Sequence, residues 1–112
     1  MKKLVAIIQP FMLDEVRQAL NDIGIESMTI SDVRGHSRQK GDKVVYRGQE
    51  YTVDLLPKIK IEMVVPAERS EDVVSAVSGA ARRGKLDDGK IFISDVADVV
   101  RIRTGERGEF AL

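Results

Sequence analysis

The chain has no cysteine and only one histidine, His36, among its 112 residues. The first absence excludes disulfides, thiolate metal ligands and a cysteine nucleophile, and the second excludes every site that needs two histidines. An enzyme needs a placed base or nucleophile, and no His, Cys or carboxylate pair stands out as one. We therefore expect a protein that is not an enzyme.

An excess of charge of either sign is also missing, because 18 Lys and Arg residues balance 18 Asp and Glu residues. A general attraction to nucleic acid or to an anionic membrane is therefore not favoured. The apolar run at residues 4–8 is too short for a signal-peptide core or a membrane span. We expect a soluble cytoplasmic protein with a single domain over residues 1–112.

The apolar residues fall into two similar halves. In the first half, residues 3–9 form a short apolar run closed by Pro10, which is typical of a buried central strand. Apolar residues then recur at spacings of three and four over 13–23, which predicts a helix that ends at Gly24. Residues 26–34 predict a second strand.

The second half repeats this order. Residues 58–65 alternate apolar and polar, Ser70 is a predicted helix N-cap, and residues 91–96 predict the last strand. Two β-α-β units joined by a long loop predict a ferredoxin-like α+β sandwich. Helices cover only one face of such a sheet, and the few aromatic and many small aliphatic residues favour burial of the other face in an oligomer.

The connection over about 36–56 is the most unusual segment. It shows almost no apolar periodicity, and we predict an exposed arm without regular structure, a feature that is usually functional in a compact domain. Both tyrosines, Tyr46 and Tyr51, lie in it. Because tyrosine is normally a core or interface residue, the arm indicates a docking element and a signalling role.

The segment at about 82–90 is a candidate phosphate loop. Its glycines allow backbone N–H groups to approach an anion, and Lys90 adds a positive charge. The spacing is not that of a P-loop, and the segment follows a helix. The alternative is an ordinary turn with Gly84 as the helix stop and Asp88 and Gly89 as turn residues.

The C-terminal segment, 98–112, carries a second candidate at residues 101–106. If these residues are extended, Arg101 and Arg103 project from one face while Ile102 packs inward. Two adjacent guanidinium groups repel unless an anion joins them, and arginine suits phosphate. The alternative is a solvated edge with Glu106 and Asp98 as neighbours.

The root of the long loop is the third candidate. Its small and polar residues suit contact with phosphate or carboxylate, and the alternative is an ordinary polar loop. They are Gly35, Ser37, Arg38, Gln39, Lys40, Gly41 and, across the mouth of the loop, Lys58.

Specific motifs along essentially the whole chain resemble the nitrogen-regulatory PII signal-transduction family. They include AII at 6–8, PF at 10–11, LDEV at 13–16, RQKG at 38–41, YRG at 46–48, EY at 50–51, LPK at 56–58, DGKIF at 88–92 and RIRTGE at 101–106.

The resemblance implies a homotrimer with ATP or ADP in each cleft between subunits. Lys90 would contact phosphate, and Arg101 and Arg103 would reach it from the neighbouring subunit. The implied nucleotide-binding residues are Thr29, Gly35, Ser37, Arg38, Gln39, Val64, Asp87, Asp88, Gly89, Lys90, Arg101 and Arg103.

The resemblance also implies binding of 2-oxoglutarate beside MgATP. Gln39 would offer an oxygen to Mg²⁺, and Lys40, Gly41 and Lys58 would hold the dicarboxylate. Ligand binding would then shift the population of arm conformations. Tyr51 matches the tyrosine that is uridylylated in the family, whereas the serine phosphorylated in some relatives is replaced by Gln49.

Implied partners are an ammonium channel, a uridylyltransferase, an adenylyltransferase acting on glutamine synthetase, or a sensor histidine kinase through which transcription is regulated. No direct contact with nucleic acid is implied, and membrane contact would arise only through a channel partner.

Three residues depart from the family pattern: Asp87 replaces a glycine of the phosphate loop, Gln9 a lysine, and His36 an aromatic. We expect Asp87 to repel phosphate, so Asp87→Gly should tighten ATP binding. We expect Gln9 to weaken the positive electrostatic potential around the cleft, and His36 to alter the packing of the loop root.

Three alternatives remain. A divergent PII-like trimer that senses the adenylate ratio or another metabolite would be expected to lose Gln39, Lys58 or Tyr51, yet all are present. A small ferredoxin-like phosphohydrolase would have to recruit Arg38, Asp88 and Lys90. An RNA-binding module would need aromatics on its central strands, and these strands have none.

Overall fold

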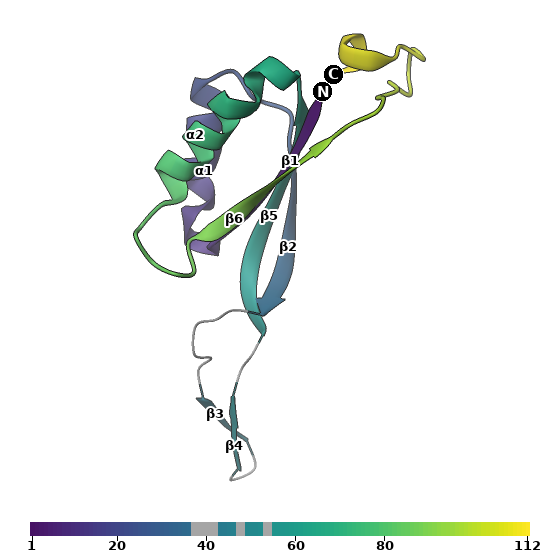
Figure 1. Ribbon diagram of the computed structural model, residues 1–112. Coiled ribbons are helices and arrows are strands. Elements are labelled where there is room, and N and C mark those ends of the chain that lie inside the picture. The colour runs from purple at the N-terminus through teal and green to yellow at the C-terminus, as the bar shows by residue number, and fades with distance from the viewer. Residues whose placement is uncertain (37–42, 47–48, 53–54) are drawn as a thin grey trace.

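The computed structural model describes residues 1–36, 43–46, 49–52 and 55–112, and its body is an antiparallel sheet with two helices on one face (Figure 1). The sheet order is β2-β5-β1-β6. The strands are β1 (Lys2–Ile8), β2 (Thr29–His36), β5 (Leu55–Val65) and β6 (Gly89–Asp95), and the helices are α1 (Leu13–Asp22) and α2 (Ser70–Ala81). This architecture confirms the predicted ferredoxin-like α+β fold.

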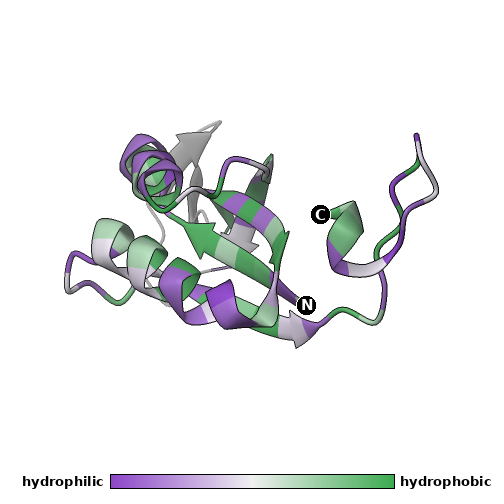
Figure 2. Ribbon diagram, turned by 90° about the horizontal axis from the view of Figure 1, so that it is seen from above, coloured by the Kyte–Doolittle hydropathy of each residue, from purple (hydrophilic) through white to green (hydrophobic). Residues whose placement is uncertain are grey.

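The core lies between the sheet and the helices. Alternate residues of β1 and β5 point toward the helices, and Figure 2 shows an apolar run along the strand that begins at the N-terminus. Each fully buried aliphatic side chain contributes about 1.5–3 kcal/mol by leaving water. The fully or almost fully buried residues are Leu4, Ala6, Ile8, Val16, Leu20, Ile59, Ile61, Met63, Val65, Val73, Val77 and Ala81.

Short 3-10 turns lead into both helices, Pro10–Met12 before α1 and Ala67–Arg69 before α2. The predicted N-cap role of Ser70 is wrong, because Ser70 is the first residue of α2 and no side-chain cap is formed there. The backbone is already turning before the helix begins, and the N–H of Ser70 donates to the carbonyl of Ala67. The predicted stop at Gly24 is confirmed by its positive φ of 82°.

The long connection contains a β-hairpin, so the prediction of an arm without regular structure is wrong. Strands β3 (Lys43–Tyr46) and β4 (Gln49–Thr52) pair in antiparallel register and lie well away from the body (Figure 1). Val44, Val45 and the tyrosines suit strands, and two intervening residues are the usual length of a hairpin connection. Strand β2 extends to His36 and β5 already begins at Leu55, so the arm is shorter than the segment predicted over 36–56.

The face of the sheet opposite the helices, which we call the open face, mixes charged and apolar residues. Lys3 and Lys60 lie 3.3 and 3.7 Å from the Glu62 carboxylate, and Phe92 is 57% exposed. The predicted one-sided helix cover is therefore confirmed. By strand register this face also carries Val5, Ile7, Lys58, Val64, Lys90 and Ser94.

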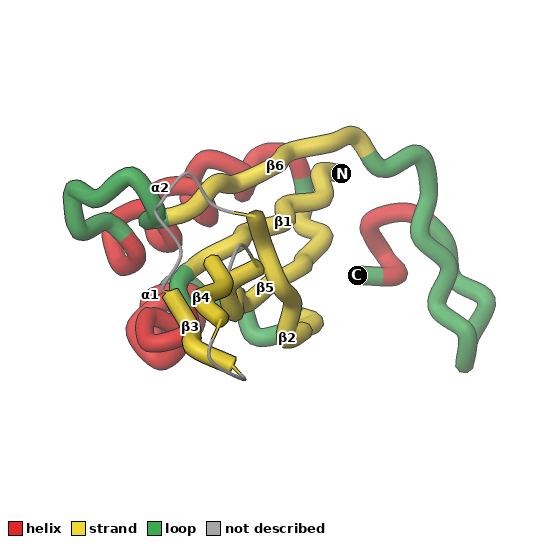
Figure 3. The backbone as a smooth tube through the Cα atoms, turned by 90° about the horizontal axis from the view of Figure 1, so that it is seen from below, coloured by secondary structure: helices red, strands yellow, loops and turns green. Residues whose placement is uncertain are grey.

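The chain after β6 stands apart from the sheet and helices (Figure 3). It folds back through a bridge between Val100 and Arg107 and ends in a 3-10 turn, Gly108–Ala111. Ile102 and Phe110 are 99% and 82% exposed. Among the described residues, no helix has the length and apolar character needed to cross a membrane.

Substitution of Gly89 tests the close contact between β1 and β6. It has φ of 120°, and a Cβ added there would lie 1.9 Å from the Ile7 carbonyl oxygen. We expect Gly89→Ala to lower the free energy of unfolding by at least about 3 kcal/mol, measured by urea denaturation at a fixed protein concentration.

Gly79→Ala in α2 is the matched control, because an added Cβ there would meet nothing within 4 Å. It should raise stability by about 0.5–1 kcal/mol. Equal stability of the Gly89 and Gly79 variants would contradict the contact.

Candidate functional site

The loop between α2 and β6 is fixed by the carboxylate of Asp88. Its Oδ2 accepts hydrogen bonds from the backbone N–H groups of Arg83, Gly84 and Lys85 at 2.7, 2.9 and 3.2 Å. The helix-stop role predicted for Gly84 is wrong, because α2 ends at Ala81 and Arg82 is already extended; the φ of 78° at Gly84 instead belongs to the turn that follows. These three N–H groups are thus bound within the chain, so an anion at this loop must be held by other groups.

The ionisation of Asp88 follows from these contacts. The N–H of Arg83 is the largest influence lowering the pKa of this carboxyl below its usual value; the N–H groups of Lys85 and Gly84 and the Arg83 guanidinium act in the same direction. Partial desolvation opposes them. Arg83 Nε lies 3.3 Å from Asp88 Oδ1 but is poorly aligned for a hydrogen bond. Asp88 is therefore a structural anion in the loop.

The carbonyl and carboxylate groups of Asp87 contact Gln9 and Arg83 rather than the backbone N–H groups that bind Asp88. The Gln9 amide nitrogen donates to its carbonyl oxygen and to its Oδ2, both at 2.7 Å. Arg83 Nη2 lies 3.2 Å from Asp87 Oδ1, and the Arg83 guanidinium carbon lies 4.8 Å from the centroid of the Phe11 ring. Gln9 and Arg83 were absent from the predicted site. Asp87 is among the predicted nucleotide-binding residues, but the sequence does not indicate that Gln9 is its partner.

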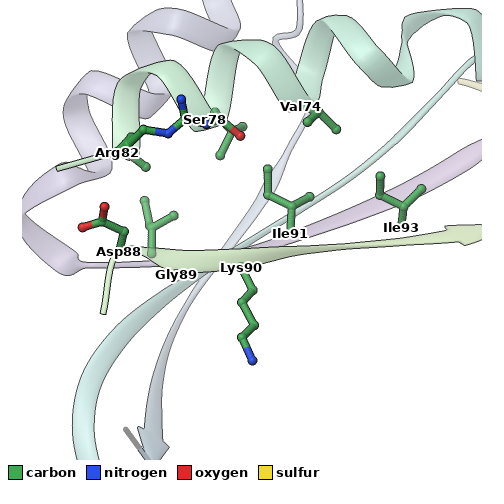
Figure 4. A pocket seen from close by; sticks show the side chains of 11 residues that line it. Val74, Ser78, Arg82, Asp88, Gly89, Lys90, Ile91 and Ile93 are labelled. Atoms are coloured by element: carbon green, nitrogen blue, oxygen red, sulfur yellow. The ribbon is translucent and has the colours of Figure 1, made fainter. Parts of the chain in front are cut away.

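Lys90 lies on the other side of β6 from the Asp88 carboxylate. Figure 4 shows its side chain extending away from α2, whereas Arg82 and Asp88 border a groove of about 310 Å³ between α2 and β6. Ile7 of β1 pairs with both Lys90 and Lys60. The two lysines therefore flank Ile7 on the open face, at the end of the sheet nearest the arm.

Lys58 lies at the same end of the sheet. It is 8% exposed, and a Cβ added at Gly35 would lie 3.3 Å from its Cγ. Glycine at position 35 leaves room for the lysine stem against β2. The predicted pair at the loop root, Gly35 and Lys58, is therefore in contact near the end of the sheet from which the arm extends.

Thr29 and Val64 border a second hollow, of about 380 Å³, with Ala111 and Leu112 of the C-terminal segment. Val64 pairs with Lys3, whereas Lys90 pairs with Ile7 further along β1. One chain thus places Thr29 and Val64 near its own C-terminus and toward the opposite end of the sheet from the residues of the candidate phosphate loop.

The arginine segment is a tight turn, so the expectation of an extended segment with Ile102 packed inward is wrong. Gly105, with φ of 74°, allows the reversal, and its N–H donates to the Arg101 carbonyl at 2.8 Å. Arg101 lies 3.4 Å from Glu106 and donates to the Leu112 carbonyl at 3.1 Å. The Glu106 contact agrees with the edge alternative, whereas Asp98 pairs with Arg107 at 2.8 Å.

Several predicted site residues lie outside the described part of the chain: Ser37, Arg38, Gln39, Lys40 and Gly41. Tyr51 pairs through its backbone with Val44 in the hairpin. Among the side chains that the structure describes, in residues 1–36 and 55–112, no group of three His, Asp or Glu is placed to hold a metal. Gln39, the predicted Mg²⁺ ligand, is not among them.

Asp88→Asn tests the role of the carboxylate charge. Because the folded pKa lies below the unfolded value of about 3.9, the ionised group adds stability at neutral pH. That contribution is lost as the pH falls from about 4 through the folded pKa. We expect the variant to be less stable than wild type at pH 7, with a gap that narrows below pH 4 in urea titrations.

Asp88→Ala is the control, because it removes the acceptor oxygens at every pH and should stay less stable than wild type in acid. A gap for Asp88→Asn that is independent of pH would contradict the role of charge.

Comparison with known proteins gives a consistent result. A family model described as "Nitrogen regulatory protein P-II" matches residues 1–106. Proteins of that name from Rhodobacter capsulatus and, as P-II 1, from Escherichia coli K12 are each 54% identical over 112 residues, covering 100% of both chains. The Rhizobium meliloti protein is 52% identical over 108 residues, covering 96% of each chain.

A crystal structure of Arabidopsis thaliana PII bound to citrate superposes with a TM-score of 0.80 at 39% identity, covering 99% of this chain and 91% of that one. The relatives are named as regulatory proteins rather than enzymes. The ferredoxin-like sheet, the arm and these matches together show that the chain belongs to the nitrogen regulatory protein P-II family.

Proposed function

We propose that the chain is a signal transducer that binds ATP or ADP and 2-oxoglutarate and controls nitrogen-metabolism proteins through its arm. One observation carries the proposal: Lys58, Lys60 and Lys90 gather at the end of the open face from which the arm extends. Anionic ligands bound there would lie at the root of the element that meets partners. Binding of an anionic ligand would therefore be coupled to the conformation of the arm.

A homotrimer would complete the site. Phe92, Ile102 and Phe110 are exposed in the single chain, and apolar surface of this kind favours association. Arg101 and Arg103 belong to the C-terminal segment, which stands apart from the sheet and helices of the same chain (Figure 3). A neighbouring subunit would bring these arginines to the phosphates, with Thr29 and Val64 facing the nucleotide.

Each ligand would use charge-assisted contacts. Lys90 would bind phosphate, and Gln39 would share Mg²⁺ with ATP and 2-oxoglutarate. Lys58 and the backbone amides of Lys40 and Gly41 would hold the carboxylates. The Arabidopsis thaliana relative is bound to citrate, another carboxylic acid, which is consistent with a carboxylate ligand. Binding would change the arm only through different affinities for its conformations.

The arm would then act on partners in the cytoplasm. These are an ammonium channel, a uridylyltransferase, an adenylyltransferase or a sensor histidine kinase that regulates transcription. Uridylylation of Tyr51 would add a bulky anion to the hairpin and redirect its contacts. No step of this scheme requires catalysis by the chain itself.

A trimer that senses only the ratio of ATP to ADP is the second candidate. The observation that favours it is Asp87, an acidic residue in the candidate phosphate loop that can shift the balance between nucleotides of different charge. The two candidates differ in whether 2-oxoglutarate binds after MgATP.

Calorimetric titration of MgATP, followed by 2-oxoglutarate, tests the proposal. We expect Lys90→Met to weaken MgATP binding about 10–100-fold, because a charged hydrogen bond contributes about 1.5–3 kcal/mol. Lys58→Met should remove the heat of 2-oxoglutarate binding.

Arg17→Met, which removes an exposed cation from α1, is the control and should bind both ligands as wild type does. Binding of MgATP without 2-oxoglutarate would favour the adenylate sensor, and the absence of any nucleotide binding would overturn both candidates.

A further inference from the structure

The contact between Gln9 and Asp87 joins two segments that are 78 residues apart in the sequence. Gln9 follows the last residue of β1 and is 7% exposed, and the Asp87 side chain is 12% exposed. The Gln9 amide reaches both the carbonyl and the carboxylate of Asp87 at 2.7 Å. The contact is therefore a nearly buried one that fixes both the backbone and the side chain of the loop.

Arg83 completes this arrangement from the opposite side. Its Nη2 lies 3.2 Å from Asp87 Oδ1 and its Nε lies 3.3 Å from Asp88 Oδ1, while its guanidinium lies over Phe11. Each oxygen of the Asp87 carboxylate thus has a donor, Gln9 on one and Arg83 on the other. We call this set, Gln9, Arg83 and Asp87, the carboxylate latch.

The charge balance of the loop explains why such a latch matters. Between Arg82 and Lys90 the chain has four basic and two acidic residues. Asp88 is held by backbone N–H groups, and Asp87, three residues before Lys90 in the sequence, is the second carboxylate of the loop. A carboxylate that turned toward Lys90 would pair with its ammonium and would also repel a bound phosphate.

We propose that Gln9 is a positioning residue that holds the Asp87 carboxylate against Arg83 and so leaves Lys90 available to a phosphate group. This inference rests on the proposed nucleotide site. It also revises the expectation drawn from sequence, because Asp87 opposes phosphate only when the latch is open. A neutral amide suits the task, since its two N–H groups satisfy two acceptors without adding a further charge.

A double-mutant cycle on the full chain tests the latch, with MgATP affinity measured by calorimetry. Gln9→Met keeps the length of the side chain and removes both donors. We expect it to weaken MgATP binding about tenfold when Asp87 is present, and to have a several-fold smaller effect in the Asp87→Ala background. Gln9→Lys, which restores a donor to the carboxylate, should bind MgATP more tightly than Gln9→Met.

Gln18→Met is the matched control. Gln18 also donates to an aspartate, Asp22 at 2.8 Å, but on the exposed surface of α1, and the substitution should leave MgATP affinity unchanged. Circular dichroism of every variant at a fixed concentration separates a local effect from loss of fold.

Equal losses from Gln9→Met in both backgrounds would overturn the latch while leaving the nucleotide site intact. A wild-type protein that binds no MgATP would instead overturn the proposed function, and with it the role of the latch in affinity.

Discussion

The structure depends on one constraint: the sheet is covered by helices on one face only. Alternation along each strand sends Leu4, Ala6 and Ile8 into the core and leaves Lys3, Val5 and Ile7 on the open face. The neighbouring strands add Lys58, Lys60 and Lys90 to that face through their register. The same alternation that builds the core therefore also places these three lysines on one face of the sheet.

Two elements meet at the end of the sheet near Gly89: the loop before β6, which many contacts hold in place, and the projecting arm. Gly89 presses against the Ile7 carbonyl, Asp88 binds the three preceding N–H groups, and Gln9 holds Asp87. These contacts fix the loop before β6. On the other side, β2 and β5 continue past the body toward the hairpin (Figure 1). A ligand that spans the two would contact the fixed loop and the root of the arm together.

Sequence patterns predicted the fold well because the spacing of apolar residues that marks a helix or a strand can be seen within that element's own segment. Spacings of three and four identified α1, and strict alternation identified β5. The hairpin was missed because each of its strands has only four residues, which is too short for a clear period. Ser70 was misassigned because a 3-10 turn precedes α2, and such turns leave little trace in sequence.

The candidate site was only partly predictable for a different reason. Resemblance to the family pointed to Gly35, Lys58 and Lys90, and the fold places them at one end of the sheet. The latch between Gln9 and Asp87 depends on how β1 and β6 meet, so neither residue alone indicates its partner. The turn at Arg101 follows from the positive φ of Gly105, which the presence of glycine permits but does not require.

The central claim is that the phosphate loop of one subunit and the arginine segment of another form each nucleotide site. Co-expression of Lys90→Ala and Arg103→Ala chains tests it most directly, because neither chain alone can build a complete site. If the site lies between subunits, random assembly places an intact loop beside an intact arginine segment in roughly a quarter of the sites. Calorimetry should then show that fraction of wild-type binding, whereas a mixture that binds no better than either variant alone would contradict the account.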